Sequence, residues 1–199
     1  MLRRWRKSWV AGLLLAAAPA HADWLPPQTA APAPPFPITD PGPNAARAQL
    51  AELLWRRDQL SDARAQFEQV LAHAGPADAG RLLHCHSRLM AIAARSGDGY
   101  GEHLHRGVAL WLLATRPGGD AAEAEGLLCK AAGELTLAAR ERPDEARPHW
   151  YLARVWARLG QSQPAAASLR RAHELAPFSV LTAGERRELA EELATDQHR

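Results

Sequence analysis

Residues 146–177, ARPHWYLARVWARLGQSQPAAASLRRAHELAP, predict a pair of antiparallel helices. Apolar and small residues at helical spacing mark one face of each helix: Leu152, Ala153, Trp156 and Leu159 in the first, then Ala165, Leu169, Ala172 and Leu175 in the second. Gly160 lies between them, where a turn requires a positive φ. Pro164 can open the second helix, because the first N–H groups of a helix have no intrahelical partner. Pro177 ends this unit. A helical hairpin of this kind indicates a binding surface and supplies no catalytic chemistry.

This hairpin resembles the tetratricopeptide repeat (TPR), whose pattern is aromatic-x2-Leu-Gly-x2-Tyr, then Ala-x3-Phe, then Pro. Four positions keep the spacing with other letters: His149 at the first aromatic residue, Ala153 at the glycine, Trp156 at the tyrosine and Leu169 at the phenylalanine. The resemblance implies an all-α fold, in which TPR-like helical hairpins stack as a short right-handed solenoid.

A second hairpin is predicted over residues 44–75. Its apolar stripe consists of Leu50, Leu53, Leu54, Leu60, Ala63, Phe67, Val70 and Leu71. Ala63 and Phe67 repeat the spacing of Ala165 and Leu169, which lie 102 residues later in the chain. That interval equals three TPR periods of about 34 residues.

Between the two hairpins, residues 80–143 are helical in pattern but irregular in phase. The pattern predicts helices over residues 82–95, 103–113 and 121–141, separated by glycine-rich breaks. We expect one degenerate hairpin and one extra helix there.

A capping helix over residues 182–195 is expected to complete a TPR-like helical domain of residues 44–196. Thr182 and Glu185 have the spacing of a capping box, in which each side chain bonds the backbone N–H of the other. The rest of this helix is mostly charged, with a narrow stripe of leucines. A terminal helix with a polar outer side is typical of the end of a stacked array.

Residues 1–22 have the features of a secretory signal peptide. Four basic residues precede a ten-residue apolar run, Trp9–Ala18, and Ala20 and Ala22 form a small-x-small cleavage site. The run is shorter than the roughly 20 residues that a membrane-spanning helix needs. We expect cleavage before Asp23, a periplasmic location and no stable membrane insertion afterwards.

Residues 23–43 form a proline-rich leader, with eight prolines between Leu25 and Pro43. Prolines at this density exclude a helix and favour an extended, disordered spacer. Two roles fit this composition: a tether between signal and domain, or a docking peptide for a partner that recognises proline.

The net charge of the chain without its signal peptide indicates which class of partner it can bind. Removal of residues 1–22 leaves 20 basic against 22 acidic residues, a charge of −2 with neutral histidines. Nucleic-acid binding requires a strongly basic face, which such a chain lacks overall. We therefore expect a protein or peptide partner and no nucleic acid.

The TPR resemblance implies that the first helix of each hairpin lines a concave groove that binds peptides. The side chains expected to face it are Arg147, Trp150, Arg154 and Arg158 in the later hairpin, and Ala48, Glu52, Trp55 and Arg56 in the earlier one. Tryptophan and arginine are the residues of binding hot spots, and they suit a segment with carboxylates and an apolar anchor. Alternatively, Trp150 and Trp55 pack against a neighbouring helix.

Two cysteines, Cys85 and Cys129, lie in predicted helices, each shortly after a pair of leucines at 82–83 and 127–128. In an oxidising compartment they could form a disulfide, or each could be a small buried residue. Histidines at 84, 86, 103 and 105 add candidate ligands for a metal such as copper or zinc. Residues 84–86 point about 100° apart on a helix, so they cannot all bind one ion, and we expect no metal site and no cofactor.

No catalytic motif is present in the sequence, neither a nucleophile elbow nor a phosphate-binding loop nor a metalloprotease pair. The sequence therefore predicts no enzyme and no catalytic residues. It predicts an exported TPR-like scaffold or adaptor of the cell envelope that binds a protein or peptide. The alternatives are a periplasmic metal-handling protein, using His84 or His86 with His103, His105 and a cysteine, and an accessory subunit of an envelope enzyme.

Overall fold

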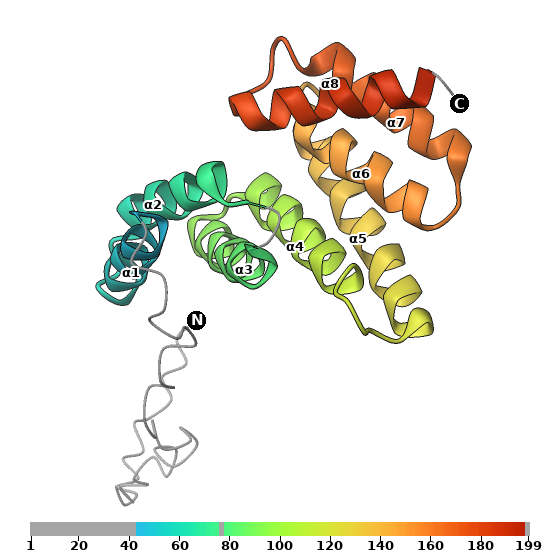
Figure 1. Ribbon diagram of the computed structural model, residues 1–199. Coiled ribbons are helices and arrows are strands. Elements are labelled where there is room, and N and C mark those ends of the chain that lie inside the picture. The colour runs from blue at the N-terminus through green and yellow to red at the C-terminus, as the bar shows by residue number, and fades with distance from the viewer. Residues whose placement is uncertain (1–42, 76–77, 198–199) are drawn as a thin grey trace, which may run out of the picture. The chain divides into compact units, whose positions relative to one another are not determined.

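The computed structural model describes residues 43–75 and 78–197. Within these residues the chain forms eight α-helices and no strand (Figure 1). The prediction of an all-α fold is confirmed for this part of the chain. The predicted signal peptide lies outside the described residues. The predicted leader does too, except for Pro43, which is the first residue of α1.

The first hairpin consists of α1 (Pro43–Arg56) and α2 (Leu60–His73). Asp58 turns the chain between them with a positive φ of 62°. Phe67 and Val70 of the predicted stripe are fully buried, as expected from their spacing. The stripe is wrong for α1, because Leu50 and Leu53 are 45% and 54% exposed. Its buried residues are instead Ala48 and Ala51, whose small side chains let α2 approach closely.

The middle of the chain contains α3 (Ala79–Ser96), α4 (Gly99–Ala114) and α5 (Ala121–Glu141). Asp98 caps α4 by accepting a hydrogen bond from the Gly101 N–H at 3.0 Å. The close packing of α4 against α5 depends on Gly107. A Cβ atom there would lie 2.7 Å from Cγ of Leu135, nearer than any van der Waals contact allows.

The hairpin of residues 146–177 contains α6 (Ala146–Arg158) and α7 (Ser162–Leu175). Gly160 turns the chain between them with a φ of 72°, as its position predicted. Leu152, Ala153 and Leu169 of the two predicted stripes are buried. The buried surface of α6 extends further round the helix than one stripe, since Ala146, Pro148, Trp150 and Val155 are buried too.

The last helix, α8 (Ala183–Gln197), begins with the predicted capping box. The Thr182 N–H donates to Oε2 of Glu185 at 2.8 Å, and the Glu185 N–H donates to Oγ1 of Thr182 at 3.2 Å. Leu189 is the buried residue that joins α8 to the core, and Leu193 is partly buried beside it.

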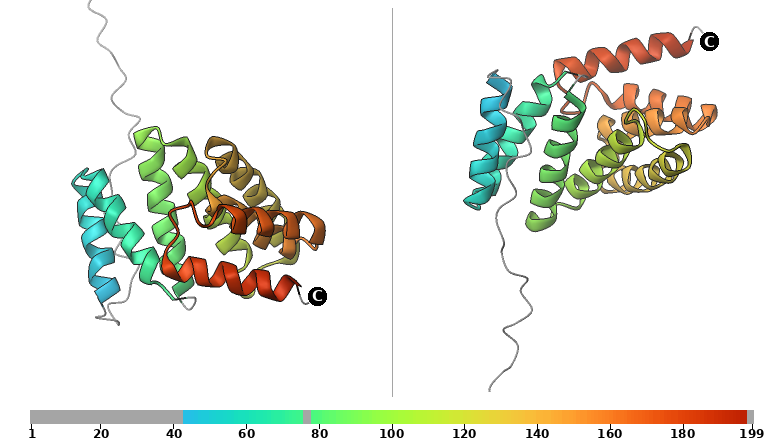
Figure 2. Two further views of the ribbon diagram at one scale, coloured as in Figure 1. Left: turned by 90° about the horizontal axis from the view of Figure 1, so that it is seen from above. Right: turned by 60° about the horizontal axis from the view of Figure 1, so that its bottom comes forward.

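Every helix of the compact unit Asp40–Arg199 packs against the next helix in the chain (Figure 2). Three successive groups of buried side chains form the core. They centre on Phe67 and Leu89, on Leu104 and Leu135, and on Trp150 and Leu189. None of the helices in the described residues combines the length and apolar character needed to span a membrane.

Candidate functional site

The predicted groove residue Trp150 lies in the core, so the expectation that it faces an open groove is wrong. Its ring is 2% exposed and packs among Ala146, Leu169 and Leu189. Its Nε1–H donates to Oε2 of Glu192 on α8 at 2.8 Å. The alternative interpretation, in which Trp150 packs against a neighbouring helix, is the one that the structure has.

Arg154 links α6 to α8 beside this tryptophan. Its Nε donates to Oε1 of Glu192 at 2.8 Å, and its Nη2 donates to Oε2 of Glu188 at 3.0 Å. Its guanidinium carbon lies 4.1 Å from the ring centroid of Trp150 and 5.7 Å from that of Trp111 on α4. A cation stacked between aromatic faces and paired with carboxylates is strongly held.

Arg147 makes a second link from α6 to the start of α8. Its Nε and Nη2 donate to the two carboxylate oxygens of Glu185 at 2.7 and 2.9 Å, and Nη2 also donates to the Val180 carbonyl at 2.9 Å. Burial alone would lower the pKa of Arg147 and raise that of Glu185. The forked ion pair outweighs burial, so it raises the pKa of Arg147 and lowers that of Glu185.

The predicted groove residues of α1 hold α3 in a similar way. Glu52 accepts hydrogen bonds from Nε and Nη2 of Arg88 at 2.7 and 3.2 Å, and Nε2 of His84 lies 2.7 Å from its Oε1. Arg88 and Arg95 lie 5.4 and 5.2 Å from the ring centroid of Trp55. Burial raises the pKa of Glu52, but the bonds from Arg88 and His84 lower it overall.

Four of the predicted groove residues therefore make side-chain hydrogen bonds to another helix of the array: Arg147, Trp150, Arg154 and Glu52. Trp55 is partly buried under arginines of α3, and Ala48 lies in the core. Arg56 and Arg158 are exposed, and neither has an ion-pair partner among the described residues. The sequence grouped these residues on one side of each helix but did not indicate that a neighbouring helix covers much of that side.

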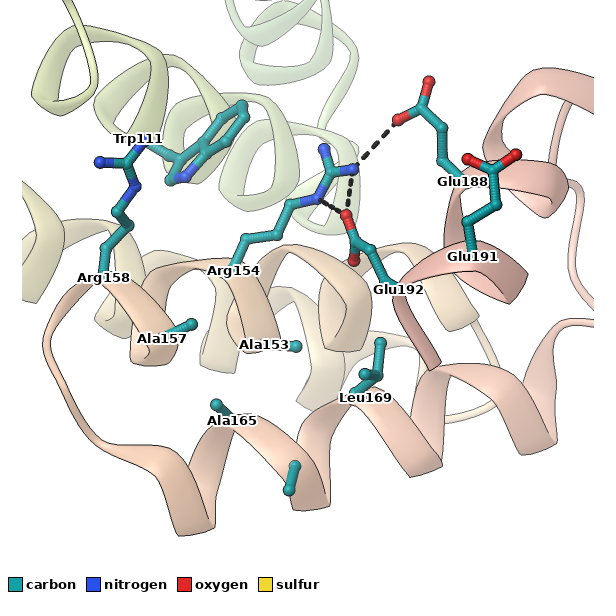
Figure 3. Close-up of a pocket in the computed structure, with 11 residues that line it drawn as sticks. Trp111, Ala153, Arg154, Ala157, Arg158, Ala165, Leu169, Glu188, Glu191 and Glu192 are labelled. Atoms are coloured by element: carbon teal, nitrogen blue, oxygen red, sulfur yellow. Dashed lines mark hydrogen bonds and ion pairs between the residues drawn. The ribbon is translucent and has the colours of Figure 1, made fainter. Parts of the chain in front are cut away.

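A pocket of about 560 Å³ lies between α6, α7 and α8 (Figure 3). Its lining consists of Trp111, Ala153, Arg154, Ala157, Arg158, Ala165, Ala166, Leu169, Glu188, Glu191 and Glu192. Alanines of α6 and α7 form an apolar floor, and Figure 3 shows glutamates of α8 on one side and arginines of α6 on another. The small floor residues leave room for an apolar side chain, and the charged rim can bind polar groups beside it.

Four aromatic or charged pocket residues are absent from the predicted groove: Trp111, Glu188, Glu191 and Glu192. Trp111 comes from the irregular middle of the chain, and the glutamates come from the predicted capping helix. The spacing of Glu188 and Glu192 from Glu185, three and seven residues, was the available signal, because such residues share one helix face.

The two cysteines do not form a disulfide, and both are free thiols. Cys85 is fully buried against α1 and α2, and burial raises its pKa to about 12. Cys129 is exposed on α5. The candidate disulfide is therefore wrong for this fold, because the two helices present their cysteines to different surroundings.

The histidines are dispersed among separate contacts. His86 and His105 are buried together, with their Nδ1 atoms 3.0 Å apart. His103 lies 2.7 Å from Glu134, and His84 contacts Glu52. No group of three or more potential metal ligands occurs in the part of the chain that the structure describes.

No protein-family model matches the chain, and no curated protein matches it. A solved structure of a thermophilic TPR protein from Thermus thermophilus is similar, with 20% sequence identity and a TM-score of 0.41. The similarity covers 78% of this chain and 100% of that one. In the described residues, helical hairpins that pack in chain order and end in a capped polar helix form an all-helical repeat fold.

Proposed function

We propose that this chain is an exported scaffold of the bacterial cell envelope that binds a partner protein at the pocket between α6, α7 and α8. The TPR-like fold supports a role in protein–protein interaction. The observation that carries the proposal is the pocket itself, where an alanine floor meets the exposed guanidinium of Arg158, which has no ion-pair partner among the described residues.

The pocket chemistry indicates what the partner presents. An apolar side chain fits the floor formed by Ala157, Ala165 and Ala166. A carboxylate next to it would pair with Arg158, whose planar guanidinium can donate two parallel hydrogen bonds. Binding hot spots combine these two features, an anchor in a pocket and a charged group at its edge.

Charge reversal at the pocket rim tests this proposal. Mature protein is immobilised and exposed to envelope extract, and retained proteins are quantified by mass spectrometry for wild type and for Arg158→Glu. We expect at least tenfold loss of the specific partner in the variant. The matched control is Arg170→Glu, which reverses an exposed charge on α7 outside the pocket lining. Equal retention by all three proteins would contradict the proposal.

The metal-handling alternative gains no support from the histidine and cysteine side chains, which the fold divides among separate contacts. An accessory-subunit role would use the same protein-binding surface. Identification of the retained partner as an enzyme would favour that role.

A further inference from the structure

The face of α8 that covers α6 has a regular pattern of charge. Glu185, Glu188 and Glu192 lie at intervals that place them on one side of the helix, with Leu189 among them. The carboxylates contact Arg147, Trp150 and Arg154 of α6, and Leu189 is buried beside the ring of Trp150. We define the α6 face as Arg147, Trp150 and Arg154.

The α6 face matches this pattern group by group. Arg147 makes a forked pair with the first carboxylate, and Arg154 pairs with the second and third. The indole N–H of Trp150 donates to the third. The α6 face therefore recognises a helix of the form Glu-x-x-Glu-Leu-x-x-Glu, and α8 is an example of such a helix within the chain.

Apolar packing holds α8 less firmly than it holds the other helices. Among the described side chains of α8, Leu189 is the buried one, whereas α6 buries six residues. Most of its side-chain contacts with α6 are ion pairs, whose carboxylates are 21% exposed at Glu185, 51% at Glu188 and 33% at Glu192. The most exposed of these pairs, Arg154 with Glu188, contributes little net stability in water and weakens further as salt screens it.

We propose that the α6 face binds an acidic amphipathic helix of a partner protein, and that α8 covers this face until the partner helix takes its place. The proposal rests on the proposed function, since it specifies how a bound partner engages the array. Displacement needs no new recognition chemistry, because the incoming helix would make the contacts that α8 makes. The apolar residue of the incoming helix would occupy the place of Leu189.

A peptide of residues 181–197, LTAGERRELAEELATDQ, serves as the probe, with a fluorescent label at its N-terminus. Its affinity is measured by anisotropy for the mature wild-type chain and for Glu188→Lys/Glu192→Lys. In wild type the tethered α8 competes at an effective concentration in the millimolar range. In the variant the two lysines repel Arg154 and release the α6 face. We expect the variant to bind the probe at least tenfold more tightly.

Two controls define the contact. The same peptide carrying both lysines should not bind the variant. Adding Arg154→Glu to the variant restores opposite charges between α6 and α8, so the gain in affinity for the wild-type probe should disappear. Equal affinity of wild type and variant for the probe overturns the proposal. A swapped dimer of the variant, detected by light scattering, overturns it too, because the occupant would then be a second copy.

Hydrogen exchange keeps the proposal testable if the variant does not fold. In wild type, we expect amides of α8 to exchange at least tenfold faster than those of α6, and faster still in high salt. Equal protection of the two helices would make α8 an integral part of the core and overturn the proposal.

Arg158→Glu separates this proposal from the proposed function. This substitution should leave probe binding to the Glu188→Lys/Glu192→Lys variant unchanged, because Arg158 does not contact α8 among the described interactions. A change in partner retention without a change in probe binding is a result about the pocket of the proposed function. A change in probe binding without a change in partner retention is a result about the α6 face.

Discussion

At the scale of single residues, burial decides which of two tryptophans on α6 supports the fold. The apolar stripe predicted Trp156 for the core and Trp150 for an open groove. In the structure Trp150 is the more deeply buried of the two, since it is 2% exposed and Trp156 is only partly buried. Both helix faces are covered, one by α4 and α5 and the other by α7 and α8, so one stripe could not describe α6.

Replacement of Trp150 by alanine should therefore lower the free energy of unfolding by about 3–5 kcal/mol, because it leaves a cavity and removes the N–H that donates to Oε2 of Glu192. Trp156→Ala should cost less, about 1–2 kcal/mol, because part of that ring already contacts water. Urea unfolding followed by circular dichroism measures both. Arg158→Ala is the control, with an expected change below about 0.5 kcal/mol. A larger loss for Trp156 than for Trp150 would contradict the structural assignment.

The buried pair His86 and His105 should make stability depend on pH. Burial lowers the pKa of His86 to about 3, and burial beside His86 lowers that of His105 well below the ordinary value. Both rings are neutral in the folded chain, whereas the unfolded chain takes up protons below about pH 6.5. Stability is therefore complete above that pH and decreases as the pH falls from about 6.5 towards 3.

The double variant His86→Leu/His105→Leu removes both titrating groups without leaving one ring unpaired. Between about pH 6 and 4, the free energy of unfolding of wild type should fall by up to about 1.4 kcal/mol per pH unit for each histidine. The double variant should not show this part of the decrease. Denaturant midpoints across this range provide the measurement. His173→Gln, at an exposed position, should keep the wild-type slope. Parallel curves for wild type and the double variant would exclude the pair as the cause.

At the scale of helices, packing distance depends on small residues as well as on apolar stripes. The α4–α5 pair meets at Gly107, where Leu135 occupies the space that a side chain would need. The sequence predicts helices on both sides of this contact, but a glycine within a helix by itself predicts only local weakness. The role of Gly107 follows only from the position of α5 in the tertiary structure.

Gly107→Ala should destabilise the protein by about 1–3 kcal/mol, since the new Cβ forces Leu135 or a helix backbone to move. Gly133→Ala on α5 is the matched control, because no atom lies within 4 Å of its added Cβ. That substitution should stabilise the protein by up to about 1 kcal/mol through higher helix propensity. Thermal melting of the two variants tests the difference, and a stabilised Gly107→Ala would show that α4 and α5 are further apart.

At the scale of the whole molecule, the proposed export would decide in which compartment the helical unit works. We expect the mature protein to begin at Asp23, because Ala20 and Ala22 supply the small side chains that signal cleavage requires. N-terminal sequencing of protein from the envelope fraction tests this. As a control, the Ala22→Leu variant, expressed at the same level as wild type, should not be cleaved. Full-length wild-type protein in the inner membrane would indicate that residues 9–18 act as an anchor.

The sequence by itself determined most of the helices, the turn before α7 and the cap at the start of α8. The positions of Gly160, Pro164, the capping box of Thr182 and the recurring apolar residues predict them, because helix formation depends on residues a few positions apart. Only the tertiary structure decided what covers each helix. Arg147 and Glu185 are 38 residues apart, and no local spacing connects them.

The same distance explains the errors on the candidate site. Tryptophan and arginine on one side of α6 are equally suited to bind a foreign carboxylate or one from the same chain. The choice depended on where α8 packs, which is set by the burial of Leu189 and by the two ion-paired arginines together. Those energies arise only after the chain has brought distant segments into contact, so tertiary structure determined the site that local sequence could only outline.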